Sequence, residues 1–219
     1  MRVRVLYLLV VTGILLFTIV SVAPVSAPVP IEELAYDDGT YENAVFYIFA
    51  GEQVAVRFSL PAGWTTAKIL QAKYYLWAGV DDLVAPFRVH IYDSDLTTDL
   101  TTPFIATPTT NDTWFVVDLT GLDIIVSNDF YIGIQWLTHG SPWLMVDEDP
   151  PIDLRSYALI IPNYPNWVLV EGGDAMIRAV VEQVLVPSAP EFNLSIPVVT
   201  SVVAAIYIAL RKRIGKNIE

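Results

Sequence analysis

The sequence contains no cysteine and only two histidines among its 219 residues. The lack of cysteine excludes disulfide bonds, thiol catalysis and zinc–thiolate sites. His90 and His139 are not spaced as a pair of metal ligands, and His90 lies in an alternating pattern that favours a packed or surface side chain. The sequence also lacks a Gly-x-Ser-x-Gly setting and a glycine-rich phosphate loop, so it shows no apparatus for nucleophilic catalysis.

Basic residues are scarce in the middle of the chain. Residues 28–190 contain 22 Asp and Glu against six Lys and Arg. An acidic domain of this kind repels phosphate backbones, so we expect no nucleic-acid partner. It attracts cations and stays soluble in salt, and the sequence leaves open whether the acids form a solvated exterior or specific cation sites.

The start of the chain has the pattern of a secretory signal. Met1-Arg2-Val3-Arg4 precedes an apolar run from Val5 to Val20. Small residues at the expected cleavage spacing end at Ala23 and Ala27, but proline follows each of them. We therefore predict that residues 1–27 form either a signal peptide or an uncleaved anchor.

The end of the chain predicts a membrane anchor. Residues 192–210 carry no charge, and a helix of 19 residues nearly crosses the ~30 Å hydrocarbon core of a bilayer. The basic tail 211–219 begins with Arg211-Lys212-Arg213, which predicts that this end faces the cytoplasm. Residues 28–186 then form one extracellular domain, joined to the anchor by the linker 187–191.

Residues 28–186 show alternating, β-type patterns and no convincing helical period. The stretch Glu52 to Leu60, for example, places Val54, Val56 and Phe58 on one face of a predicted strand. Turn signals recur at the spacing of antiparallel sandwiches. The prediction is an all-β, jelly-roll-like antiparallel sandwich with about ten strands, at residues 44–50, 52–60, 69–78, 87–92, 114–119, 130–137, 143–146, 157–161, 167–171 and 175–184.

The tail resembles a known sorting signal. Pro190-Glu191-Phe192, followed by the apolar stretch and the basic cluster, is similar to the archaeal PEF-CTERM signal. That resemblance implies surface processing by an archaeosortase-like enzyme. Asn193 and the six residues beyond Arg213 depart from the pattern, and an ordinary membrane anchor remains the alternative.

Short motifs in the domain resemble the jelly-roll modules appended to secreted prokaryotic peptidases. They are Tyr36-Asp37-Asp38-Gly39, Ala55-Val56-Arg57-Phe58, Phe130-Tyr131-Ile132-Gly133-Ile134 and Asp174-Ala175-Met176-Ile177-Arg178-Ala179, in that order. The resemblance implies a non-catalytic accessory module.

Three groups of carboxylates are candidate sites for a structural calcium ion. Calcium needs six to eight oxygen ligands, and alternate acids in a loop supply them. The candidate ligands are Asp37, Asp38, Asp93, Asp95, Asp99, Asp147 and Asp149. The loop that begins at Asp93 lacks the glycine and glutamate of an EF-hand, and solvated acidic loops remain the alternative. The module resemblance places the ion first at Asp37 and Asp38.

Aromatic residues suggest a second kind of site. Trp77 and Trp136 fall in apolar strand patterns and are predicted to be core residues. Trp64, Tyr164 and Trp167 lie near strand starts or turns and are candidate contacts to a ligand such as a sugar ring. Asn111-Asp112-Thr113 is a sequon that predicts N-glycosylation of Asn111.

The sequence thus predicts a membrane-anchored, non-enzymatic extracellular β-sandwich that acts as a cell-surface interaction or envelope module, with a surface glycan or protein as its expected partner. A carbohydrate-binding module is the first alternative. A surface hydrolase is the second, and it requires two carboxyl groups about 5 to 10 Å apart across a cleft.

Overall fold

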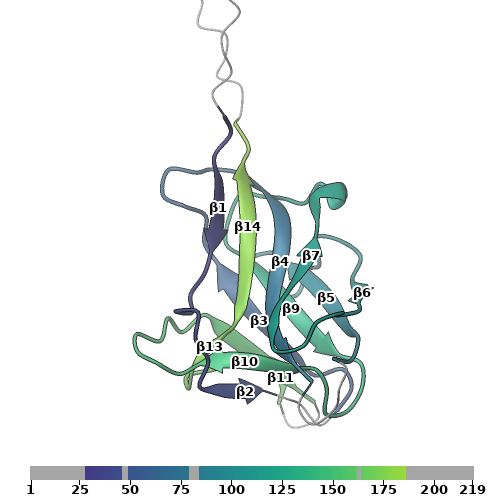
Figure 1. Cartoon of the computed structure of the whole chain (residues 1–219). Helices are drawn as coiled ribbons and strands as arrows, with labels where there is room; N and C mark the ends of the chain where they lie inside the picture. The colour runs from purple at the N-terminus through teal and green to yellow at the C-terminus, as the bar shows by residue number, and fades with distance from the viewer. Residues whose placement is uncertain (1–27, 46–48, 79–83, 162–163, 186–219) are drawn as a thin grey trace, which may run out of the picture. The chain divides into compact units, whose positions relative to one another are not determined.

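The computed structural model describes residues 28–45, 49–78, 84–161 and 164–185 (Figure 1). All its strands belong to one compact unit, Met1–Gln183, and a second unit, Val184–Glu219, is described only at its first two residues. The described residues contain no helix that is long and apolar enough to cross a membrane. Five predicted features lie outside the described residues and stay predictions: the signal segment 1–27, the linker 187–191, the membrane helix 192–210, the tail 211–219 and the motif Pro190-Glu191-Phe192.

The first of two antiparallel sheets, called sheet A, has eight strands. β1, β14, β4 and β7 lie next to one another in that order, while β8 and β10 pair with the two ends of β4. Its strands are β1 (Ile31–Leu34), β2 (Asn43–Val45), β4 (Ala67–Trp77), β7 (Thr113–Asp118), β8 (Ile125–Val126), β10 (Trp143–Asp147), β13 (Asp174–Ala175) and β14 (Ile177–Gln183). A short 3-10 helix, η1 (Thr120–Leu122), connects β7 to β8.

The second sheet, called sheet B, has six strands in the order β12-β11-β3-β9-β5-β6. Its strands are β3 (Gln53–Phe58), β5 (Phe87–Tyr92), β6 (Phe104–Ala106), β9 (Phe130–Trp136), β11 (Ser156–Ile160) and β12 (Tyr164–Leu169). All pairings in both sheets are antiparallel.

The order of strands is that of a jelly roll. The chain passes from β1 in sheet A to β3 in sheet B, returns to β4, and then crosses to β5. It goes on through β6, β7, β9 and β14, so that β1-β14-β4-β7 forms one sheet and β3-β9-β5-β6 the other. Two four-stranded layers linked in this way are typical of jelly rolls. The predicted all-β, jelly-roll-like sandwich is confirmed.

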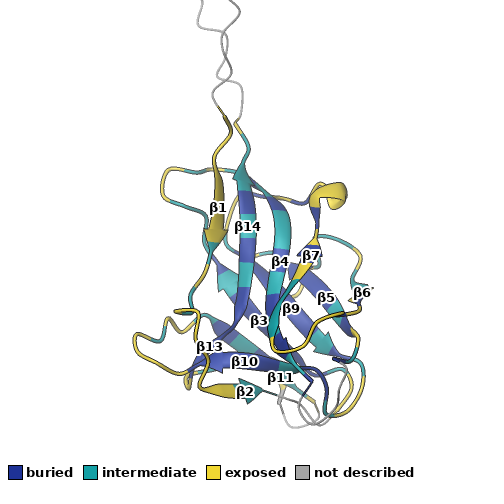
Figure 2. Cartoon of the chain, viewed as in Figure 1, coloured by how far each residue is buried: buried dark blue, intermediate teal, exposed yellow. Residues whose placement is uncertain are grey.

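The core lies between the inner faces of the two sheets, as the dark blue stripes along the strands in Figure 2 show. In β4, Tyr74 and Leu76 are fully buried while Tyr75 and Trp77 alternate to the outer face. Trp136 is a fully buried core residue, as predicted. The prediction for Trp77 was wrong: this side chain is half-buried and packs edge-to-face on Trp143 with ring centres 5.0 Å apart.

The first and last strands of the sandwich bring the two ends of the domain together at one end of sheet A. β1 starts where β14 ends, because Ile31 pairs with Glu182 and the Gln183 amide donates a hydrogen bond to the Pro30 carbonyl at 3.0 Å. Figure 1 shows the start of β1 beside the end of β14. We call this end of sheet A the exit end.

Candidate functional site

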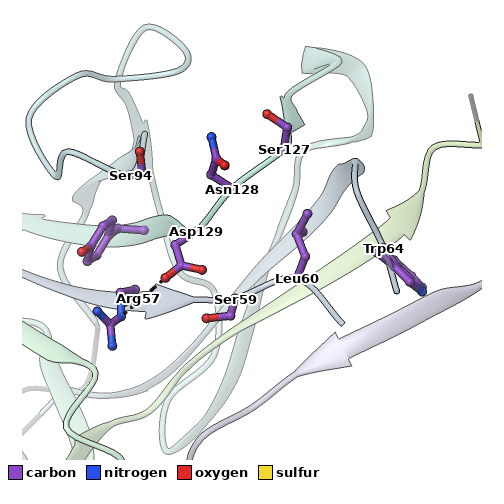
Figure 3. Close-up of a pocket in the computed structure, with 9 residues that line it drawn as sticks. Arg57, Ser59, Leu60, Trp64, Ser94, Ser127, Asn128 and Asp129 are labelled. Carbon is purple, nitrogen blue, oxygen red and sulfur yellow. Dashed lines mark ion pairs between the residues drawn. The ribbon is translucent and has the colours of Figure 1, made fainter. Parts of the chain in front are cut away.

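An open pocket of about 680 Å³ lies where β3 ends and β9 begins (Figure 3). Arg57 and Tyr131 reach it from the outer face of sheet B. Its remaining lining comes from three loops, which contribute Ser59, Leu60, Trp64, Ser94, Ser127, Asn128 and Asp129. The lining therefore combines one tryptophan and one tyrosine ring with several hydrogen-bonding groups.

The charged pair of the pocket is loosely joined. Arg57 Nε lies 3.9 Å from Asp129 Oδ2, which is an ion-pair contact but is too long for a hydrogen bond. Arg57 Nε is buried and finds no hydrogen-bond partner among the described residues. Burial raises the pKa of Tyr131, whose ring packs edge-to-face on Tyr157. The pocket thus holds a guanidinium whose Nε has no hydrogen-bond partner among the described residues, and two aromatic rings belong to its lining.

Of the three aromatic candidates, the structure places Trp64 in this pocket. Trp167 is half-buried and does not line it; its ring packs edge-to-face on Tyr92, with centres 5.8 Å apart. Trp167 and Tyr157 cover a small cluster on the outer face of sheet B formed by Ala55, Tyr92, Leu96 and Tyr131. Tyr164 begins β12, and its side chain lies outside the described residues. A ligand contact by any of the three stays a prediction.

The fold brings two of the predicted calcium groups together at one corner. The Asp38 amide donates to Asp147 Oδ2 at 2.7 Å, and the Asp149 amide donates to Asp147 Oδ1 at 2.9 Å. The Asp37 carboxylate is bound by Arg178 through Nε and Nη2. Backbone amides and one guanidinium thus already occupy much of the acceptor capacity of these acids.

Sequence reasoning missed Asp174, which belongs to the same corner. It is 3% exposed and pairs across the strands with Asp147. Its Oδ2 accepts a hydrogen bond from the Asp153 amide at 2.9 Å, but its buried Oδ1 has no partner among the described residues. Burial, followed by the nearby carboxylates of Asp153, Asp147 and Asp37, raises the pKa of Asp174. We call Asp37, Asp38, Asp147, Asp149, Asp153 and Asp174 the acidic corner.

The third calcium group is separate from this corner and is engaged locally. Asp95 accepts hydrogen bonds from the Thr98 hydroxyl and from the Thr97 and Thr98 amides, and these bonds, led by the Thr98 hydroxyl, lower the pKa of Asp95. Asp93 accepts from the Ser94 amide at 2.7 Å. Asp99 lies 3.0 Å from His90 Nδ1. In the part of the chain that the structure describes, no three acidic or histidine side chains are arranged to hold a metal ion.

The remaining two predicted positions have ordinary surroundings. His90 is 8% exposed and stacks on Tyr92 with ring centres 5.0 Å apart, so it is a packed histidine, as the alternation indicated. Asn111 is exposed, and its Oδ1 accepts a hydrogen bond from the Ala78 amide at 2.8 Å. Glycosylation of Asn111 stays a prediction.

Comparisons with known proteins find similarity both in sequence and in structure. No protein-family model matches the chain. The chain is 32% identical over 168 residues to bacillopeptidase F of Bacillus subtilis. The aligned region covers 68% of this chain and 11% of that protein. It also resembles the cysteine protease and lectin-like domains of Cwp84, a surface layer associated protein of Clostridium difficile, with a TM-score of 0.45, 13% identity, and coverage of 62% and 32% of the two chains. The chain therefore spans about a tenth of the length of the curated peptidase to which it is similar.

Proposed function

We propose that the chain is a non-enzymatic β-sandwich module displayed on the outer face of a membrane by its terminal segments. The observation that carries this proposal is the β1–β14 pair, which brings Pro30 and Gln183 within one hydrogen bond of each other. The chain leaves the sandwich in both directions at this place, and each direction leads to a stretch predicted to enter a membrane. Similarity to a minor part of a peptidase supports an accessory, non-catalytic module.

The test uses the absence of cysteine from the chain. We expect the full chain to sediment with membranes, and a cysteine at the exposed Leu154 (Leu154→Cys) to react with an impermeant maleimide on intact cells. A cysteine in the basic tail (Ile214→Cys) should react only after the cells are permeabilised. A chain that stays in the soluble fraction, or two cysteines with equal reactivity on intact cells, would contradict the proposal.

Carbohydrate binding is a second candidate, and the composition of the pocket favours it. Trp64 offers a ring that can stack on a sugar, while Arg57, Asn128 and Asp129 offer hydrogen bonds to hydroxyl groups. Trp64→Ala should therefore abolish binding on a glycan array. Trp114→Ala, on the outer face of sheet A, should leave binding unchanged because Trp114 does not line the pocket. Failure of the unaltered protein to bind any glycan would exclude this candidate.

Hydrolysis is less well supported than binding. Among the residues that line the pocket, Asp129 is the single carboxylate, and glycoside hydrolysis needs a pair of them. We therefore expect a bound polysaccharide to remain intact during long incubation. Release of sugar that disappears in Asp129→Asn would reverse this assignment.

Calcium binding at the acidic corner is a further proposal. The acids of this corner are not arranged as a ready metal site in the described part of the chain, so binding would require their side chains to turn toward the ion. The unpartnered Asp174 Oδ1, near the carboxylates of Asp147 and Asp37, supports the proposal because Arg178 is bound to Asp37 and leaves Asp174 without a counter-charge. Calcium that binds only the native state should raise the melting temperature, and chelator should reverse the rise. Asp174→Asn should remove most of the shift. An identical melt of the original protein with and without calcium would rule the site out.

A further inference from the structure

The exit end of sheet A carries exposed aliphatic side chains. Ile31 is 56% exposed, Ile125 is 48% exposed and Leu122 is 45% exposed. Ile125 pairs with Lys68, Lys68 with Glu182, and Glu182 with Ile31, so these four residues form one row across β8, β4, β14 and β1. Directly paired residues share a face of the sheet, so the two isoleucines lie on the outer face, about 14 Å apart at ordinary strand spacing.

The short helix η1 extends this apolar surface beyond the row. Leu122 lies in η1, which immediately precedes β8, and η1 has no buried residue. Figure 2 shows η1 and β1 as exposed elements at the same end of the sheet. We call Ile31, Leu122 and Ile125 the exit surface. The exit surface is therefore apolar at the two ends of the row and charged between them, at Lys68 and Glu182.

The length of chain beyond the sandwich indicates what covers the exit surface. Eight residues lie between Gln183 and Phe192, where the charge-free stretch 192–210 begins, and an extended chain of that length spans at most about 30 Å. On the other side, nine residues lie between Val20, the end of the first apolar run, and Pro30. Both tethers start at the exit end. If these stretches enter a membrane, the tethers allow the exit end to lie at most about 30 Å from it.

The charges of the row define the kind of lipid. Lys68 lies 2.5 Å from Asp123 and opposite Glu182, so one cation faces two carboxylates. Anionic headgroups would be repelled by this balance, whereas zwitterionic headgroups would not. Aliphatic side chains beside a weakly charged row suit the boundary between headgroups and acyl chains.

We propose that the exit surface rests on the zwitterionic lipid interface of the membrane, so that the sandwich stands on one end with Ile31, Leu122 and Ile125 in contact with lipid. This inference rests on the proposed membrane anchoring and adds an orientation to it. It also assigns a role to aliphatic residues that the sandwich core does not use.

The experiment uses the full chain in phosphatidylcholine vesicles. A single cysteine at Ile125 (Ile125→Cys) carries a bimane label, and brominated phosphatidylcholine is the quencher. The matched control is Ile105→Cys, an isoleucine in β6 that is 59% exposed and lies on the other sheet. We expect bromine to cause a loss of fluorescence at position 125 and no loss at position 105.

The experiment distinguishes a wrong orientation from a wrong membrane anchoring. If the chain floats with the vesicles but bromine quenches the label equally at positions 105 and 125, the proposed orientation is wrong and the anchoring stands. A chain that does not float with the vesicles overturns both the anchoring and the orientation. Stronger quenching at position 105 than at position 125 places a different face against the lipid and also overturns the inference.

Discussion

At the scale of single residues, Arg178 joins β14 to the segment that follows β1. Its Nε and Nη2 bind the Asp37 carboxylate, and its Nη1 donates to Glu33 Oε1 at 3.1 Å. The guanidinium carbon also lies 4.4 Å from the centre of the Trp114 ring. Since the Asp37 side chain is 1% exposed, this arginine neutralises a charge that water cannot reach.

Arg178→Ala should therefore lower the free energy of unfolding by about 3 to 5 kcal/mol, because it leaves a buried carboxylate unpaired. Urea unfolding followed by tryptophan fluorescence measures the change. Lys68→Ala is the matched control: its partner Asp123 is 83% exposed, so the expected cost is at most about 1 kcal/mol. Equal costs for the two variants would show that Arg178 does not hold the acidic corner.

Asp174 makes stability depend on pH with a defined sign. Its pKa is raised in the folded protein, so the folded state holds a proton that the unfolded state has already released. Stability therefore falls as pH rises from the ordinary aspartate pKa, 3.8, through the raised value. We expect Asp174→Asn to gain stability relative to the original protein between pH 4 and pH 7 in calcium-free buffer. Melting curves at the two pH values, with Asp149→Asn as an exposed control, measure the difference; a constant difference would argue against this role.

Residue identity alone predicted part of the candidate site. Trp64 was named as a candidate ligand contact because it lies at a turn, and the pocket does contain it, although its ring also packs against the core. Asp174 was missed because its burial and its pairing with Asp147 arise from strands that are far apart in sequence. Arg57 was quoted for a motif but not as a site residue, since nothing in the alternating pattern shows that a strand end opens into a pocket.

At the scale of elements, the turn that leads into β13 leaves no room for a larger side chain. A Cβ on Gly173 would lie 2.5 Å from Val146 Cγ1 and 2.8 Å from the Asp147 carbonyl oxygen. Its neighbour Gly172 has open space at the same position. The close packing of this turn against β10 therefore requires a glycine at position 173 but not at position 172.

Gly173→Ala should cost about 1 to 3 kcal/mol of stability, as overpacking of a close contact does. Gly172→Ala should change the free energy of unfolding by less than about 0.5 kcal/mol. Chemical denaturation of both variants gives the comparison. A tolerated alanine at position 173 would mean that β10 and this turn can separate without loss.

Long alternating elements were predictable and short ones were not. Phe87–Tyr92 matches its predicted bounds because hydrophobic and polar residues alternate along all of it. β1 was missed because three of its four residues are exposed and prolines precede it. β6 has three residues within a stretch rich in threonine and proline, and only its pairing with β5 makes it a strand. Trp77 was wrongly predicted to be a core residue because β4 carries large apolar residues on both faces. The sequence therefore does not show which face of this strand is buried.

At the scale of the whole molecule, the sandwich carries a large excess of negative charge. Residues 28–190 hold 22 acids and six bases, so the folded state is destabilised by self-repulsion that salt screens. We expect the melting temperature to rise as sodium chloride is increased from low to molar concentration. Potassium chloride should act alike, because screening does not depend on the identity of the monovalent cation. A melting temperature that falls with salt would show that surface ion pairs outweigh the repulsion.

The pairing of β1 with β14 also decides how the module would respond to force. Four residue pairs join β1 to β14, and seven join β14 to β4. If the two tethers were drawn apart, the β1–β14 ladder would open from the Pro30–Gln183 bond one rung at a time, like a zipper. If both tethers are held in one membrane while a ligand is pulled outward, the two strands are loaded in the same direction and their shared ladder is not opened. A module tethered in this way would unfold at low force when its two tethers are pulled apart. It would withstand a higher force when a bound ligand is pulled away from the membrane.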